Sequence, residues 1–165
     1  MLIPGPRDPN IGNILPAPAL APGFTARLRA KVRHFVSASN PARLLFFGQE
    51  ICIFRGDLHQ RFRRAAVLCE PAGDAVKLCG TVAKTVCDQA HLSPMALTKQ
   101  PVAWNFDHAL RLYPLPDVLL LADVVDNVED DYQGCKFVTP GAFANNGTFL
   151  VYLPASKTTE FSSVD

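Results

Sequence analysis

Residues 117–122 read Asp117-Val118-Leu119-Leu120-Leu121-Ala122, a short run that is apolar throughout after its first residue. Such a run is typical of a strand that is buried on both faces of a sheet. Further short strands are predicted on its C-terminal side at residues 136–138, 148–153 and 159–161, the last two joined across 154–157. We therefore expect a strand-rich C-terminal half, with residues 124–134 as a loop or the start of a helix.

The N-terminal half predicts helices around a β-hairpin. Residues 43–47 and 50–54 read as two strands, joined by a tight type II′ turn at Gly48-Gln49. Asp57 can cap a helix that follows, with Gln60 three residues on, and another helix should run from near Asp74 to a point before Pro94.

The inward faces of these two helices are expected to hold Leu58, Phe62, Ala65 and Ala66 in the first, and Val76, Cys79, Ala83, Val86, Cys87 and Ala90 in the second. An amphipathic helix is also predicted over residues 24–36, with Phe24, Leu28, Val32, Phe35 and Val36 turned inward.

Helices interleaved with strands indicate an α/β or α+β layered fold, and 165 residues are enough for one compact domain. Before the first helix, Leu2-Ile3 reads as the stub of a strand, and the stretch from Pro4 to Pro22 reads as an irregular loop because it is rich in proline, glycine and asparagine.

The charge balance excludes a strong long-range field. Sixteen Lys and Arg against fifteen Asp and Glu give a formal charge of +1, so the chain as a whole is not drawn to DNA or to a membrane surface. No segment approaches the roughly 18 apolar residues of a membrane span, and the first residues do not form a signal peptide, so we expect a protein that is not exported and has no membrane partner.

The cysteines argue against a disulfide framework or a zinc site. There are five of them, widely spaced and without a C-x-x-C pair, which fits a reducing, intracellular setting.

Two basic helix faces are candidates for contacts to nucleic-acid phosphates, which require only positive charge. The candidate residues are Arg27, Arg29, Lys31 and Arg33 on the first face and Arg61, Arg63 and Arg64 on the second. The alternative, which we favour, is that both are ordinary solvated helix faces. Trp104 is interpreted as a core or interface anchor rather than a base-stacking platform.

Simple catalytic motifs are absent from the sequence: it contains no H-E-x-x-H, Walker loop, Rossmann glycine pattern or G-x-S-x-G elbow. We interpret the adjacent pair Asp107-His108 as structural, because neighbours in sequence rarely point at one substrate. His34 and His59 are expected to be solvated. Asn146-Gly147-Thr148 is interpreted as a hairpin turn rather than a glycosylation site.

The opening segment Ile3-Pro4-Gly5-Pro6-Arg7-Asp8 resembles a loop of calcineurin-like metallophosphoesterases, in which a Gly-Asn-His-Asp or Gly-Asn-His-Glu motif supplies a metal-binding Asn and a catalytic His. Gly5 and Asp8 match that motif, but Pro6 stands in place of the Asn and Arg7 in place of the His. Proline has no ligand side chain and arginine offers no lone pair to a metal. The resemblance therefore implies a half-site that cannot function.

A second motif of the same family is Gly-His-x-His, and the segment at the corresponding position here is Ala122-Asp123-Val124-Val125. Asp123 and Val125 stand where the family has histidines, and only His91 keeps a residue type that such an enzyme could use. One histidine cannot assemble a two-metal clamp. The resemblance implies no catalytic residue, no bound metal and no cofactor.

This degenerate pattern resembles the second, or B, subunits of eukaryotic replicative DNA polymerases, and most closely that of DNA polymerase epsilon. The longest similar stretch covers residues 104–117. Others in the same order cover residues 3–9, 12–16, 39–43, 49–58, 91–94 and 140–143.

The resemblance implies the C-terminal half of a calcineurin-like phosphoesterase sandwich, with mixed sheets and flanking helices, whose site is inactive. We expect residues 1–165 to be the C-terminal part of that domain. The oligonucleotide-binding-type domain and the first half of the phosphoesterase domain are absent from this chain, which suggests a partial chain or a truncated gene product.

The function implied is that of a non-catalytic accessory subunit in the nucleus. It would scaffold the catalytic subunit of DNA polymerase epsilon through that subunit's C-terminal region, together with the other subunits, and make weak contacts to DNA. The alternative is a divergent metal-dependent phosphoesterase.

Overall fold

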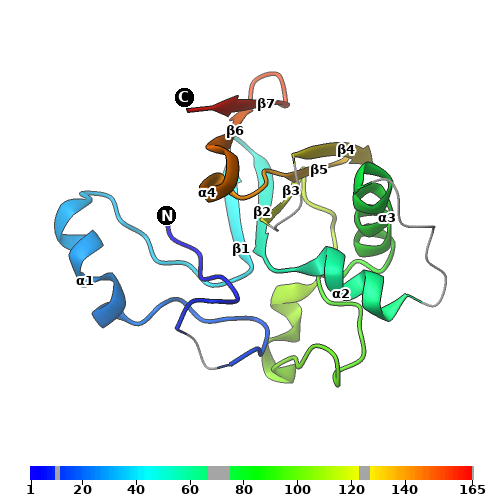
Figure 1. Cartoon of the computed structure of the whole chain (residues 1–165), viewed down its shortest axis with the longest axis horizontal. Helices are drawn as coiled ribbons and strands as arrows, with labels where there is room; N and C mark the ends of the chain where they lie inside the picture. Colours follow the sequence, from blue (N-terminus) through cyan, green and yellow to red (C-terminus); the bar gives the residue numbers. More distant parts are fainter. Residues whose placement is uncertain (10–11, 67–74, 123–126, 165) are drawn as a thin grey trace.

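A five-stranded mixed sheet forms the centre of the computed structural model, which describes residues 1–9, 12–66, 75–122 and 127–164 (Figure 1). The strands are β1 (Ala42–Phe46), β2 (Gln49–Arg55), β3 (Val118–Ala122), β4 (Val128–Tyr132) and β5 (Cys135–Thr139). They lie in the order β1-β2-β3-β5-β4, with β3 parallel to β2 and β5 and the outer pairs antiparallel. The central strand is therefore the one that the apolar run predicted.

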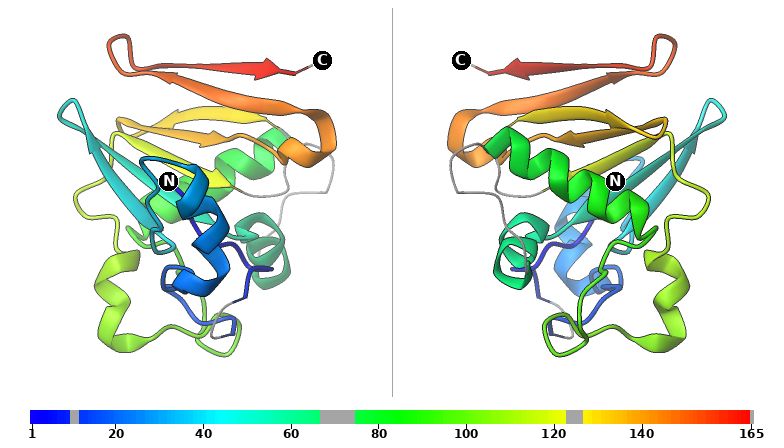
Figure 2. Two further views of the ribbon diagram at one scale, coloured as in Figure 1. Left: turned by 90° about the vertical axis from the view of Figure 1, so that its left-hand side faces the viewer. Right: turned by 90° about the vertical axis from the view of Figure 1, so that its right-hand side faces the viewer.

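One face of the sheet is covered by two helices, α2 (Leu58–Ala65) and α3 (Ala75–Asp88), and Figure 2 shows α3 lying across it. The core between them contains Phe54, Leu119 and Phe137 from the sheet and Val82 and Val86 from α3. This packing confirms an α/β layered fold with flanking helices.

The opposite face of the sheet is covered by a separate antiparallel hairpin of β6 (Thr148–Leu153) and β7 (Thr158–Ser163), preceded by the short helix α4 (Phe143–Asn146) (Figure 2). Gln49 donates from Nε2 to the carbonyl oxygen of Pro154 at 2.8 Å and also bonds to the hydroxyl of Tyr152. These bonds fix the hairpin to the end of the sheet where β2 begins.

The hairpin leaves an apolar groove of about 420 Å³ against the sheet. The residues that line it on the sheet side are Leu44, Ile51, Ile53, Val118 and Leu120, and those on the other side include Phe143, Phe149, Leu150 and Tyr152. The second apolar face of the sheet is thus only partly filled.

The described residues between Pro4 and the start of α1 are irregular, as expected, and the N-terminal segment is held by short backbone pairings. Leu2 pairs with Ser37, Leu15 with Val102 and Ala17 with Asn40. The helices outside the sheet are α1 (Pro22–Lys31) and the 3₁₀ helix η1 (Trp104–Leu110). No helix in the described part of the chain is long and apolar enough to cross a membrane.

The helix predicted over 24–36 is shorter than expected and its predicted inward face is wrong. α1 ends at Lys31, and Phe24, Leu28, Val32 and Val36 are exposed, while Phe35 is half-buried with the Arg29 guanidinium 5.7 Å from its ring centre. The chain leaves the helix because residues 36–38 are extended alongside Leu2, whose N–H donates to the Val36 carbonyl at 2.8 Å.

Two predicted turns have a different geometry. The β1–β2 turn is formed by Phe47 and Gly48, since Phe46 pairs with Gln49, and both turn residues have positive φ (49° and 75°), which indicates type I′ rather than II′. Gly147 is not in a hairpin: it ends α4 in the left-handed conformation and donates its N–H to the Phe143 carbonyl at 2.8 Å.

Residues 128–132, expected to be loop or helix, form β4 instead. This edge strand alternates Val128 inward with exposed charged residues, a pattern that its acidic composition concealed. Its backbone pairs with β5 along the whole length, from Val128 opposite Thr139 to Tyr132 opposite Cys135.

The two predicted helices on the sheet are confirmed, with corrections to their faces. Asp57 caps α2 by accepting from the Gln60 N–H at 3.2 Å, as expected. Ala65 and Ala66 are exposed, however, and His59 is buried rather than solvated, because α2 contacts the core with its N-terminal part, where Leu58 is buried and Phe62 packs against the core.

In α3, the predicted residues Cys79, Ala83, Val86 and Cys87 are buried, while Ala90 follows the helix end in the left-handed region (φ 48°) and is half-buried. The expected start at Asp74 and the side chain of Val76 lie outside the described residues.

Replacing Leu119 by alanine should lower the free energy of unfolding by about 2–5 kcal/mol, because its side chain, on β3, is fully buried in the core. Urea denaturation followed by circular dichroism measures this. Leu45→Ala on β1, where the side chain is 79% exposed, is the matched control and should change stability by about 0.5 kcal/mol or less. Equal losses for the two variants would contradict the assignment of the core.

Candidate functional site

The loop from Gly5 to Asp8 is closed on itself. The Gly5 N–H donates to the Asp8 carboxylate at 2.7 Å, and the Asp8 N–H donates to the Gly5 carbonyl at 3.1 Å. Arg55 donates from Nη1 to the Ile3 carbonyl at 2.6 Å and lies 3.4 Å from Asp8. A β-carbon on Gly5 would come within 2.6 Å of the Arg55 guanidinium, so any other residue here would require that flexible side chain to move. The side chains of Pro6 and Arg7 are both exposed.

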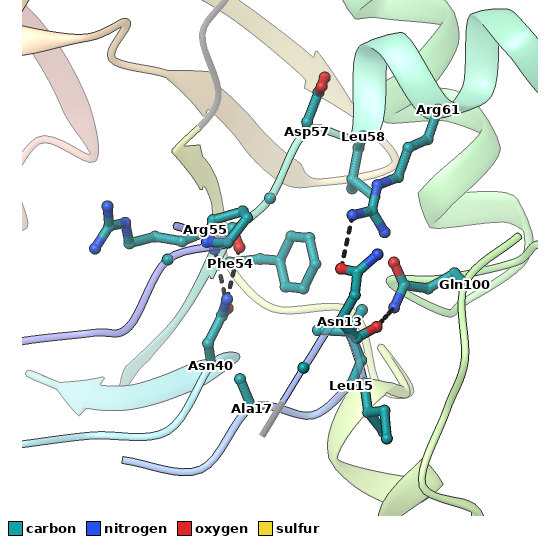
Figure 3. Close-up of a pocket in the computed structure, with 15 residues that line it drawn as sticks. Asn13, Leu15, Ala17, Asn40, Phe54, Arg55, Asp57, Leu58, Arg61 and Gln100 are labelled. Carbon is teal, nitrogen blue, oxygen red and sulfur yellow. Dashed lines mark hydrogen bonds between the residues drawn. The ribbon is translucent and has the colours of Figure 1, made fainter. Parts of the chain in front are cut away.

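A small cavity of about 30 Å³ lies beside this loop (Figure 3), with room for a water molecule. The Asn40 amide holds the backbone of Arg55, accepting from its N–H at 2.9 Å and donating to its carbonyl at 2.6 Å. On the other side, Gln100 donates to the Asn13 carbonyl at 2.8 Å and Arg61 donates to the Asn13 side chain at 3.0 Å. These polar groups around the cavity therefore hydrogen-bond to other groups of the same chain and hold its segments in place.

His91, the one residue of a type that a phosphoesterase could use, is engaged through both ring nitrogens. The Ser93 N–H donates to Nδ1 at 3.0 Å, and Nε2 lies 3.1 Å from Oδ1 of Asp107. Because Nδ1 accepts, the proton of the neutral ring is on Nε2, which donates to Asp107. Neither nitrogen presents a lone pair to a ligand in this arrangement.

Asp107 joins His91 to a third residue, Arg111, which approaches its other oxygen with Nε at 3.0 Å and Nη2 at 2.9 Å. Desolvation by itself would raise the pKa of Asp107, but the hydrogen bonds from Arg111 and then His91 outweigh it and lower the pKa below its ordinary value. The sequence suggested Asp107 and His108 as neighbours, yet His108 is exposed and the partner is 16 residues away. No local pattern indicates this pairing.

The second segment that the sequence compares with a phosphoesterase motif is only partly described. Ala122 ends β3, whereas Asp123 and Val125 lie outside the described residues. Within the described ranges there is no group of three or more His, Cys, Asp or Glu side chains placed to hold a metal ion.

The two basic helices are separate in space: α1 lies at the left of Figure 1 and α2 right of its centre. Arg27, Arg29, Lys31 and Arg33 are exposed, and so are Arg63 and Arg64 on α2. Arg61 is half-buried and bonded to Asn13. Trp104, expected in a core or an interface, is 72% exposed on η1, which excludes the core.

The sequence matches a known protein family. Residues 1–128 match the family model that describes the B subunits of DNA polymerases alpha and epsilon. The chain belongs to this family.

Relatives from animals, plants and fungi match the chain almost from end to end. It is 38% identical to human DNA polymerase epsilon subunit 2 in an alignment that covers 99% of this chain and 31% of the relative. The DNA polymerase epsilon B subunit of Arabidopsis thaliana is 35% identical with the same coverage, and that of Saccharomyces cerevisiae is 31% identical over 96% of this chain and 29% of the relative. The chain thus spans about a third of the length of these relatives, in their C-terminal part, and the resemblance to B subunits of polymerase epsilon is confirmed.

Asp107→Asn should make stability less dependent on pH in acid. The pKa of Asp107 is lowered in the folded state, so its contribution is complete above the ordinary value of 3.8 and is lost as the pH falls through the lower folded pKa. Urea unfolding between pH 2.5 and 7 should show the difference between wild type and variant shrinking toward the acid end. Glu160→Gln, an exposed acid, is the control and should show no such trend; a constant difference for Asp107→Asn would contradict the ion pair.

Proposed function

We propose that this chain acts in a non-catalytic accessory subunit of DNA polymerase epsilon, in the nucleus, where it scaffolds the catalytic subunit during DNA replication. Its relatives bear the names of polymerase epsilon subunits and match nearly all of its length. The catalytic subunit, through its C-terminal region, and the other subunits of the complex are the proposed partners.

The observation that carries the non-catalytic part of the proposal is the engagement of His91. A metal ion at its Nδ1 would have to displace the Ser93 N–H, and one at Nε2 would have to displace Asp107. In the neighbouring vestigial loop, the Asp8 carboxylate is used by the Gly5 N–H and by Arg55. Side chains that could serve a phosphoesterase are used here to hold loops together, which supports a degenerate site.

We further propose that residues 1–165 are the C-terminal part of an inactive phosphoesterase-like domain. An oligonucleotide-binding-type domain and the first half of the phosphoesterase domain would then belong to the part of the relatives that this chain does not match. The half-filled groove between the five-stranded sheet and the β6–β7 hairpin supports this view, because a complete sandwich would cover that apolar face.

The proposal also includes direct but weak contacts to DNA. They would use the exposed cations Arg27, Arg29, Lys31 and Arg33 on and after α1, together with the exposed Arg63 and Arg64 and the half-buried Arg61 of α2. Since the two sets lie on separate helices, each could neutralise only a few phosphates, and binding should be weak and sensitive to salt.

A chimaeric accessory subunit tests the partnership. Human DNA polymerase epsilon subunit 2, with its matched C-terminal part replaced by this chain, should co-purify with the C-terminal region of the human catalytic subunit when the two are co-expressed. The natural human subunit serves as the positive control. A chimaera that is soluble and folded but is not retained would contradict the proposed scaffolding role.

An assay of phosphodiester hydrolysis separates this function from the alternative enzyme. With bis(p-nitrophenyl) phosphate and manganese, the same chimaera should show no turnover above the metal-only background. Turnover that requires manganese and disappears in His91→Ala would instead establish a divergent metallophosphoesterase.

A further inference from the structure

Large apolar side chains on α1 are exposed to solvent. Phe24 is 64% exposed and Leu28 44% exposed, and in the whole helix only Thr25 is buried. Phe24, Arg27, Leu28 and Lys31 are spaced i, i+3, i+4 and i+7, so they lie on one face of the helix. This spacing is the one by which amphipathic helices dock into apolar grooves.

The apolar surface continues from the helix to the N-terminal residues. Val32 and Val36, which follow α1, are 45% and 55% exposed, and Met1 is 51% exposed. The Leu2 N–H donates to the Val36 carbonyl at 2.8 Å, and the Ala38 N–H donates to the Leu2 carbonyl at 2.9 Å, which places Met1 beside this segment. We call Met1, Phe24, Leu28, Val32 and Val36 the α1 patch. Figure 2 shows the N-terminus next to α1.

The charges around the patch restrict what can cover it. Residues 22–36 contain four Arg and Lys side chains, Arg27, Arg29, Lys31 and Arg33, and no Asp or Glu. A second copy of the chain would bring two such sets of cations together, which is unfavourable. A nucleic acid would pair with the cations but would leave the apolar row exposed. An apolar protein surface with carboxylates at its rim satisfies both features.

The relatives indicate where such a surface comes from. This chain matches 31% of the human subunit, its C-terminal part, so the larger part of that relative precedes the position of Met1. Any chain joined to Met1 would begin beside Val36, because Leu2 is hydrogen-bonded to that residue.

We propose that the α1 patch is the surface against which the preceding part of the accessory subunit packs, with Phe24 and Leu28 in an apolar groove and with carboxylates facing Arg27 and Lys31. The inference rests on the domain organisation proposed above, and it assigns the exposed helix to an interface within the subunit rather than to DNA.

Hydrogen exchange on the human chimaera tests the packing. Backbone amides of residues 22–36 should exchange at least about tenfold more slowly in the chimaera than in the 165-residue chain, while the amides of α2 serve as the reference. Phe24→Glu combined with Leu28→Glu should abolish that protection in the chimaera. The matched control, Leu45→Glu with Phe47→Glu at the β1–β2 turn, changes two side chains that are 79% and 82% exposed and should leave it intact.

A milder double substitution provides a second test in case the double glutamate variant does not fold. Phe24→Ala with Leu28→Ala keeps a good helix former at both positions and should lower the melting temperature of the chimaera without lowering that of the 165-residue chain. A loss of equal size in both proteins would show that the two side chains support only the chain itself, and would overturn the proposal.

Three other results would also overturn it. Exchange in residues 22–36 that is equally fast in both proteins would show that the preceding part leaves the patch uncovered. Protection in the isolated chain that grows with its concentration would assign the patch to self-association, and protection that requires a single-stranded oligonucleotide would assign it to nucleic acid. Capture of the catalytic subunit is measured separately on the same chimaera, so a chimaera that is protected but not captured contradicts the scaffolding role alone.

Discussion

The burial of β3 on both faces is the constraint on which the rest of the structure depends. Leu119 and Leu121 lie in the core that the sheet shares with α3, while Val118 and Leu120 line the groove under the β6–β7 hairpin. A strand that is apolar on both sides must have a layer on each of them. Its parallel pairing with β2 and β5 also requires connections that leave the sheet, which puts α2, α3 and η1 between β2 and β3.

Asp117, the residue that precedes β3, ties several of these elements together. One of its carboxylate oxygens accepts from the Glu50 N–H of β2 at 2.9 Å, and the other lies 3.0 Å from Lys157 Nζ in the β6–β7 loop. Its carbonyl accepts from the Lys136 N–H of β5. The Glu50 N–H, and then Lys157, lower the pKa of Asp117 below its ordinary value, so this junction keeps its charge through the neutral range.

The polar groups around the Gly5–Asp8 loop and His91 hold segments of the chain together. Asn40 holds the backbone of Arg55, Arg55 closes the Gly5 loop, and the His91–Asp107–Arg111 cluster joins the loop after α3 to η1. Each of these polar side chains has a partner within the chain. Two apolar surfaces of the described residues, in contrast, are left open: the groove beneath the hairpin and the α1 patch. These two apolar surfaces, rather than the polar clusters, are therefore the places where other parts of a protein could pack.

The sequence by itself determined the elements whose signal is local. The run from Val118 to Ala122 is typical of a buried strand, and the Asp57 cap needs only Gln60. The family also followed from the order of its motifs. Tertiary structure decided the rest, because it depends on contacts between distant residues: β4 exists only because β5 pairs with it, His59 is buried by where α2 packs, and Asp107 pairs with His91 instead of its neighbour His108. The periodicity of residues 24–36 could likewise not reveal that nothing in the described chain covers its apolar side.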